Sequence, residues 1–138
     1  MIALVLSLVW RRWGLLILTA AAVGLADISA TGLKDAFGIE RPSMRYAEPK
    51  PLIHPPHDPS FPSGHAATSF AAATILSAKV PRLAPVWLLL AAAIAFSRVY
   101  VGVHYPLDIV GGAVLGLLIA LLMLAADRRR SRAATRPD

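Results

Sequence analysis

Three separated stretches of this 138-residue chain place cationic and imidazole side chains beside small residues or proline. The stretches run from Lys34 to Pro42, from Pro62 to His65 and from Ser97 to Asp108. Charged groups within such apolar sequence are costly to bury unless they meet a partner, and a phosphate group is such a partner. The residue types and their spacing therefore predict a site that binds phosphate and breaks a P–O bond.

The stretches contain the positive charges that phosphoryl transfer requires. Lys34, Arg41 and Arg98 can neutralise the equatorial oxygens of the phosphoryl group, and a guanidinium suits bidentate contact with phosphate. Ser63 and Gly64 lie where a loop is expected to enter a helix, so their backbone N–H groups can point at an anion. We expect these five residues to bind the phosphate group.

Two histidines can divide the remaining chemistry. His104 and Asp108 are four residues apart, which is about one helical turn. A carboxylate at this spacing can accept a hydrogen bond from one ring nitrogen and leave the other free to attack phosphorus. His65 is the second imidazole, and the leaving oxygen needs a general acid. This pattern predicts an imidazole nucleophile that is oriented by a carboxylate.

The composition predicts an integral membrane protein. Hydrophobic residues make up 57% of the chain and charged residues 16%, which leaves too little polar surface for a soluble domain of this size. Cysteine is absent, so disulfides and thiolate metal sites are excluded. The net charge of +6 does not indicate nucleic-acid binding, because most basic residues cluster at the ends of apolar runs and no DNA-binding motif is present.

The apolar segments predict an all-α membrane bundle of about four transmembrane helices. A membrane domain is expected over 1–127 and a basic cytoplasmic tail over 128–138. The long extracytoplasmic loop is expected at 34–62, and the spans are expected at about 13–33, 64–79, 85–103 and 106–126. Alternating these spans across a bilayer brings the basic clusters to one face and the three phosphate-type stretches to the other. The basic clusters are Arg11 with Arg12, Lys79 with Arg82, and Arg128, Arg129, Arg130 and Arg132 with Arg136. Since basic flanks stay in the cytoplasm, we expect an extracytoplasmic site in the cell (inner or plasma) membrane.

Taken together, the three stretches resemble the signature of the type 2 phosphatidic acid phosphatase superfamily, which also includes the vanadium haloperoxidases. The matching patterns are Lys-x6-Arg-Pro from Lys34, Pro-Ser-Gly-His from Pro62 and Ser-Arg-x5-His-x3-Asp from Ser97. Every signature position is filled. The resemblance covers residues 34 to 108, and the helical pattern extends it to the last span.

The resemblance implies a role for each matching residue. His104 would form a phosphohistidine, Asp108 would orient it, His65 would protonate the leaving group, and water would hydrolyse the intermediate. The resemblance also implies that no metal or other cofactor takes part. The phosphate-binding residues that it implies are Lys34, Arg41, Ser63, Gly64, Ser97 and Arg98.

One departure concerns the length of the chain before Lys34. Membrane members of this family usually have six spans, with the first motif after the third, whereas one complete span is expected here. We therefore expect the chain to lack roughly the first two helices. The apolar run Met1–Trp10 would reach only ~15 Å as a helix and is interpreted as an interfacial helix or the end of a further span. A homodimer could cover the exposed face.

The resemblance favours a small bacterial lipid phosphatase as the function. Among its substrates we favour undecaprenyl diphosphate, hydrolysed to the monophosphate and phosphate, with phosphatidic acid or phosphatidylglycerophosphate as alternatives. A haloperoxidase-type oxidoreductase is a further alternative because vanadate fits the same cationic pocket, and an inactive lipid-binding relative is another. The segment His54-Pro-Pro-His57-Asp58 resembles a metal-ligand cluster, but it has no further ligands nearby and is interpreted as loop.

Overall fold

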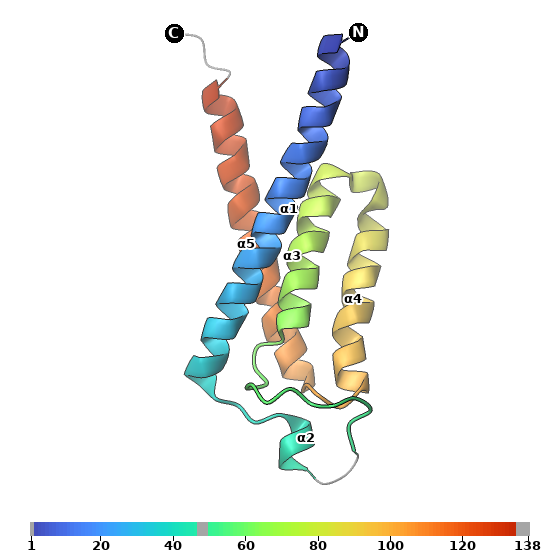
Figure 1. The fold of residues 1–138 in the computed structure, drawn as a ribbon, viewed down its shortest axis with the longest axis vertical. Helices are drawn as coiled ribbons and strands as arrows, with labels where there is room; N and C mark the ends of the chain where they lie inside the picture. The colour runs from blue at the N-terminus through green and yellow to red at the C-terminus, as the bar shows by residue number, and fades with distance from the viewer. Residues whose placement is uncertain (1, 47–49, 135–138) are drawn as a thin grey trace.

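The computed structural model describes residues 2–46 and 50–134, with side chains from Trp13 onward, as one bundle of helices (Figure 1). No strand occurs among these residues, so the predicted all-α class is confirmed. The elements are α1 (Ile2–Phe37), α2 (Pro42–Arg45), α3 (Gly64–Lys79), the 3₁₀ turn η1 (Pro81–Leu83), α4 (Ala84–Tyr100) and α5 (Pro106–Ala134).

Helix α3 is the centre of the bundle. It packs against α1, α4 and α5, whereas α4 packs mainly on α3 (Figure 1). With 16 residues, α3 is shorter than the ~20 residues that a bilayer core requires. Among the described residues, α1, α4 and α5 are the helices long and apolar enough to cross a membrane. Helix α4 reaches that length only together with η1, over Pro81–Tyr100. Three candidate spans therefore pack around α3, where about four spans were predicted.

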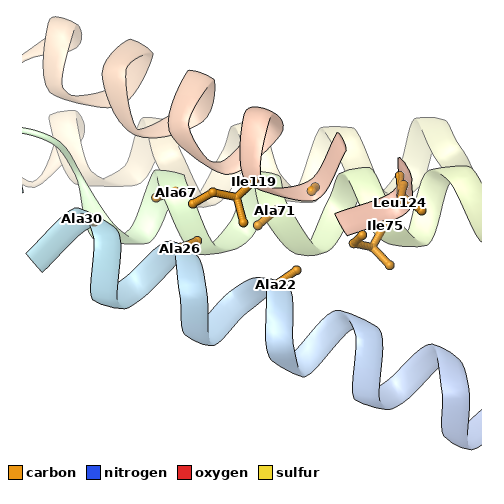
Figure 2. Packing of buried hydrophobic residues seen from close by; sticks show 9 residues of the cluster. Ala22, Ala26, Ala30, Ala67, Ala71, Ile75, Ile119 and Leu124 are labelled. Atoms are coloured by element: carbon orange, nitrogen blue, oxygen red, sulfur yellow. The ribbon is translucent and has the colours of Figure 1, made fainter. Parts of the chain in front are cut away.

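Small residues allow α1 and α3 to approach closely. Ala22, Ala26 and Ala30 recur every four residues along one face of α1, and all three are buried. They pack toward Ala67 and Ala71 of α3 in the main apolar cluster (Figure 2). In lipid, helices gain little from leaving the solvent, so tight van der Waals contact between small side chains drives their association.

Helix α5 approaches α3 even more closely. A Cβ atom at Gly116 would overlap the carbonyl oxygen of Ala67 and lie 2.9 Å from the amide nitrogen of Ala71. A Cβ atom at Gly112 would overlap the carbonyl oxygen of Ser63. These glycines therefore allow a tight helix contact, which holds the start of α3 beside the start of α5.

The helix boundaries agree with the expected spans in part. Helix α3 covers 64–79 as predicted, because the Ser63 hydroxyl accepts a hydrogen bond from the Ala66 N–H at 3.4 Å and caps it. Pro106 begins α5, where a missing N–H costs nothing. Helix α4 ends at Tyr100, three residues before the expected end at 103.

The two outer helices are longer than predicted. Helix α1 runs without a break from Ile2, so the apolar run before residue 11 continues the first span instead of forming a separate element; Met1 lies outside the described residues. Helix α5 continues through Ala134, which makes most of the expected basic tail helical, and residues 135–138 lie outside the description.

The bundle has two chemically different ends. Helix α1 begins, α3 ends and α5 ends at one end, while the loops that follow α1 and α4 lie at the other (Figure 1). Lys79 at the end of α3 donates to a carboxylate oxygen of Asp127 on α5 at 2.5 Å. Lys79, Arg82 and the basic residues of 128–132 therefore lie at the end of the bundle opposite the three phosphate-type stretches (Figure 1).

The α3–α5 contact can be tested with two glycine substitutions. Gly116→Ala should destabilise the protein by about 1–3 kcal/mol, because the added methyl group must push α5 away from the α3 backbone. Gly24→Ala on α1 is the matched control, since apart from the neighbouring backbone of its own helix no atom lies within 4 Å of its Cβ position. The measurement is the thermal unfolding midpoint in detergent, and equal midpoints for the two variants would contradict the close packing.

Candidate functional site

A cavity of about 400 Å³ opens at the loop end of the bundle, and all three predicted stretches line it. Helix α1 and the residues after it contribute a lysine and an arginine, the start of α3 a glycine and a histidine, and the α4–α5 region an arginine and a histidine. These six predicted site residues are Lys34, Arg41, Gly64, His65, Arg98 and His104. Segments far apart in the sequence thus form one polar site.

The Arg41 guanidinium joins the long loop to the segment before α5. Its side chain is only 2% exposed. Nε donates to the Asp58 carbonyl oxygen at 2.8 Å, and Nη1 donates to the Val103 carbonyl oxygen at 2.9 Å. Nη2 donates to Asp58 Oδ1 at 2.9 Å and lies 3.4 Å from the Pro59 carbonyl oxygen. Every nitrogen of the guanidinium therefore has an acceptor.

Arg41 also determines which ring nitrogen of His104 carries hydrogen. Arg41 Nη1 lies 3.1 Å from His104 Nε2, and because a guanidinium only donates, Nε2 must be the acceptor. The other ring nitrogen, Nδ1, lies 3.2 Å from Asp108 Oδ2, which can accept its hydrogen. Both side chains are 3% exposed. This arrangement puts the His104 lone pair on Nε2 at the cavity wall, where it accepts from Arg41; Nε2 can act as a nucleophile once that hydrogen bond is released.

Asp108 lies behind His104 and has a second side-chain partner that the sequence did not reveal. Ser60 is fully buried, donates its hydroxyl hydrogen to Asp108 Oδ2 and lies 3.3 Å from His104 Nδ1. The Tyr105 backbone N–H donates to the same carboxylate oxygen at 2.8 Å. Ser60 sits in a proline-rich loop without periodicity, so only its nearness to the Pro-Ser-Gly-His motif could have indicated it.

Lys34 is held by an acidic side chain from the long loop. Its ammonium group forms an ion pair with Asp58 Oδ2, and the other oxygen of the same carboxylate binds Arg41. Partial burial opposes ionisation of Asp58, but hydrogen bonds and attraction from Lys34 and Arg41 outweigh it, and the pKa of Asp58 falls below its usual value of 3.8. The carboxylate is therefore ionised at neutral pH.

The segment His54-Pro-Pro-His57-Asp58, which resembles a metal-ligand cluster, contributes the Asp58 carboxylate that binds Lys34 and Arg41. His54 and His57 stack edge to face with ring centroids 6.1 Å apart. Over residues 2–46 and 50–134, no group of three or more His, Cys, Asp or Glu side chains is arranged to hold a metal ion.

Two predicted phosphate ligands, Ser63 and Ser97, do not line the cavity. The Ser63 N–H donates to the Asp108 carbonyl oxygen at 3.0 Å, which fastens the start of α3 to α5. The Ser97 hydroxyl donates to the Ile94 carbonyl oxygen at 2.7 Å and accepts from Arg98 Nε at 3.1 Å. In this arrangement Ser97 orients Arg98, and Ser63 supports the helix start.

Three further polar residues of the helices line the cavity: Asp27 and Thr31 of α1 and Thr68 of α3. Asp27 interrupts an otherwise apolar segment, and such a charge within a span indicates a polar site. The two threonines carry no such signal, because threonine can satisfy its hydroxyl within its own helix. Thr68 does so by donating to the Gly64 carbonyl oxygen at 2.9 Å.

The site as a whole combines anion binding with a nucleophile. Lys34, Arg41 and Arg98 bring three positive charges to one cavity, and Gly64 and His65 belong to the first turn of α3, where N–H groups have no intrahelical acceptor. The acceptor nitrogen of a carboxylate-backed imidazole lies beside them. Such a site can bind a tetrahedral oxyanion and attack its central atom.

Comparison with known proteins agrees with this chemistry. Residues 13–132 match the family model described as the PAP2 superfamily. The undecaprenyl-diphosphatase of Sulfolobus acidocaldarius is 37% identical over 86 residues, which are 61% of this chain and 42% of that protein. The phosphatidylglycerophosphatase B of Bacillus subtilis is 31% identical over 93 residues, 59% of this chain and 45% of that protein. The chain thus matches less than half the length of these relatives.

Solved structures show the same arrangement of helices. The LpxE protein of Aquifex aeolicus superposes with a TM-score of 0.75 at 31% identity, covering 90% of this chain and 75% of that one. A PAP2-type phosphatidylglycerolphosphate phosphatase from Bacillus subtilis gives 0.65 at 30% identity, covering 82% and 59%. A bacterial vanadium-dependent iodoperoxidase gives 0.70 at 23% identity, covering 78% and 32%, a likeness of fold alone.

The contact between Ser60 and Asp108 can be tested by stability. Ser60→Ala should lower the free energy of unfolding by about 1–3 kcal/mol, because a buried carboxylate loses a donor that water cannot replace. Ser77→Ala is the control, since the buried Ser77 hydroxyl has no hydrogen-bond partner among the described residues. Unfolding in detergent measures both, and a Ser60→Ala loss no larger than the control's would contradict the assigned contact.

Proposed function

We propose, from the premise that the chain belongs to the PAP2 superfamily, that this membrane protein hydrolyses a lipid phosphate or diphosphate through a phosphohistidine. The observation that carries the proposal is the His104 imidazole, with Asp108 at Nδ1 and an acceptor Nε2 at the wall of a cavity that three cations line. No other described part of the chain joins a nucleophile with so much fixed positive charge.

In the proposed first step, the phosphate group of the substrate binds to Lys34, Arg41 and Arg98. His104 Nε2 attacks phosphorus, an N–P bond forms, and the P–O bond to the leaving group breaks. The cations stabilise the negative charge that grows on the equatorial oxygens. His65, which lines the same cavity, gives its proton to the leaving oxygen, and the Asp108 carboxylate stabilises the positive charge on the ring of the nucleophile.

In the proposed second step, water attacks the phosphohistidine. His65, now neutral, takes a proton from the water as the new P–O bond forms and the N–P bond breaks. Inorganic phosphate leaves, and the imidazole returns to its first state. We propose that no metal ion is required, because Lys34, Arg41 and Arg98 supply the charge that a metal would otherwise bring.

For the substrate we favour a polyprenyl diphosphate such as undecaprenyl diphosphate. The support is the similarity to the undecaprenyl-diphosphatase of Sulfolobus acidocaldarius. A phosphatidylglycerophosphate is the second candidate, supported by the similarity to the Bacillus subtilis phosphatase structure. Both substrates present a terminal phosphate on a membrane lipid.

We further propose that the protein lies in the cell (inner or plasma) membrane with its site on the extracytoplasmic side. Basic residues near span ends are retained in the cytoplasm. Lys79, Arg82 and the basic residues of 128–132 belong to the end of the bundle away from the cavity. Placing that end in the cytoplasm brings the cavity to the opposite face.

The proposed chemistry predicts the behaviour of a nucleophile variant. His104→Ala should lower phosphate release from undecaprenyl diphosphate or phosphatidylglycerophosphate by about a thousandfold or more. His54→Ala, an exposed loop histidine that does not line the cavity, should retain wild-type turnover. The wild-type rate should survive EDTA and be inhibited by orthovanadate. Loss of turnover in EDTA would contradict the metal-free mechanism, and an active His104→Ala would contradict the assigned nucleophile.

The proposed orientation predicts which cysteine reacts from outside the cell. The chain has no native cysteine, so single cysteines can be introduced at both ends of the bundle. Leu52→Cys, at a loop position that is 67% exposed, should react with a membrane-impermeant maleimide in intact cells. Arg82→Cys, at an exposed position in η1, should react only after lysis. The reverse pattern would overturn the orientation.

A further inference from the structure

The carboxylate of Asp58 holds the same two cations that the proposed function assigns to phosphate. We propose that this carboxylate is an internal competitor of phosphate for Lys34 and Arg41, and that its return to them helps phosphate to leave. The inference rests on the proposed function only in placing a phosphate group at these two residues.

The geometry of the contact resembles that of a bound oxyanion. One oxygen of Asp58 binds the Lys34 ammonium group, and the other binds Arg41 Nη2 at 2.9 Å. Two oxygens of a phosphate group would bridge an ammonium and a guanidinium in the same way. The carboxylate and a phosphate therefore cannot both use these donors fully.

Arg41 has little capacity for an additional ligand. It is 2% exposed, and each of its three nitrogens already has an acceptor. A phosphate can therefore gain a hydrogen bond from Arg41 only by replacing one of these acceptors. Binding becomes an exchange, and its free energy is reduced by that of the contact that is lost.

The Asp58 side chain is the acceptor that can leave most easily. It is 46% exposed, so the freed carboxylate can turn into water and be hydrated. The carbonyl oxygens of Val103, Asp58 and Pro59 are parts of the backbone and stay in place, and the buried His104 Nε2 leaves Arg41 only when it attacks phosphorus. Since the Asp58 carbonyl oxygen accepts from Arg41 Nε at 2.8 Å, the guanidinium remains anchored while the side chain of the same residue gives up Nη2.

The competition applies at the pH at which a cell works. Lys34 and Arg41 hold the pKa of Asp58 below its usual value, so the carboxylate stays charged at neutral pH. A ligand then binds only to the fraction of molecules whose cations are free, and its apparent dissociation constant rises by the reciprocal of that fraction. The same factor weakens the binding of substrate and of product phosphate, and so reduces product inhibition.

The test measures the binding of inorganic phosphate to the purified protein in detergent by calorimetry. Asp58→Asn removes the competing charge and should lower the dissociation constant about twofold to fivefold, the upper part of the range expected for partly exposed ion pairs. Asp58→Ser, which also removes the charge, should do the same and serves if the first variant does not fold. Asp35→Asn is the matched control, because Asp35 neighbours Lys34 in sequence but is exposed and makes no ion pair among the described residues.

A second ligand distinguishes displacement of the Asp58 carboxylate from long-range electrostatic repulsion between this carboxylate and the bound anion. Dimethyl phosphate carries one negative charge, whereas inorganic phosphate is largely a dianion at about pH 8, where both ligands are measured. If Asp58 must be displaced, its removal tightens both ligands by the same factor. A through-space effect would tighten the dianion by the square of the factor for the monoanion, and Asp35→Asn would share in it. That pattern would overturn the inference.

Unchanged or weaker phosphate binding in Asp58→Asn would also overturn it, because Asp58 would then only position the cations. The assay does not depend on turnover. A wild-type protein that binds phosphate but hydrolyses no lipid phosphate would defeat the proposed function alone. An active enzyme whose phosphate affinity does not respond to Asp58 would defeat this inference alone.

Discussion

Arg41 brings five N–H donors into a position with almost no exposed surface, and a buried guanidinium is tolerated only when its donors are satisfied. That requirement joins three separate parts of the chain. The loop must bring the Asp58 and Pro59 carbonyl groups to one side, and the segment before α5 must bring Val103 and His104 to the other. The same contacts that satisfy Arg41 orient the His104 ring, so the site and the local fold have one common cause.

Close packing of helices makes this convergence possible. The glycines of α5 let its first turns lie against the start of α3, where the Ser63 N–H reaches the Asp108 carbonyl oxygen at 3.0 Å. A bulkier residue at Gly112 would separate these helix starts and move Asp108 away from Ser60. The small residues on α1 pack against the same helix (Figure 2), and Lys34 follows the last of them, Ala30, by one helical turn. Precise placement of polar groups therefore depends on small apolar residues.

The charges of the site are partly balanced within the protein. Asp58 compensates Lys34 and Arg41, whereas Asp108 accepts from Nδ1 of His104. A cluster of three unpaired cations beside a membrane would be costly to maintain. The two carboxylates differ in burial, because Asp108 is 3% exposed and Asp58 46%. A buried carboxylate can orient a ring permanently, whereas an exposed one can be exchanged for another anion.

Much of this protein could be predicted from its residues one stretch at a time. The all-α class followed from the apolar runs, and the start of α3 followed from the end of the proline-rich loop, both of which are local signals. The cations and histidines of the cavity were recognised because such groups are rare in apolar sequence. The length of α1 was not predicted. The first span was expected to begin at residue 13, after Arg11 and Arg12, whereas helix α1 runs through both arginines.

Only the tertiary structure decided which polar residues meet. Ser60 and Asp58 lie in a loop without periodicity, and nothing local distinguishes the serine that binds Asp108 from one exposed to water. Ser63 and Ser97 match a phosphate-binding pattern, yet their hydrogen-bonding groups are used within the protein. A hydrogen bond depends on distance and direction between atoms tens of residues apart. The sequence determines which groups are present, but packing determines which of them are within reach of one another.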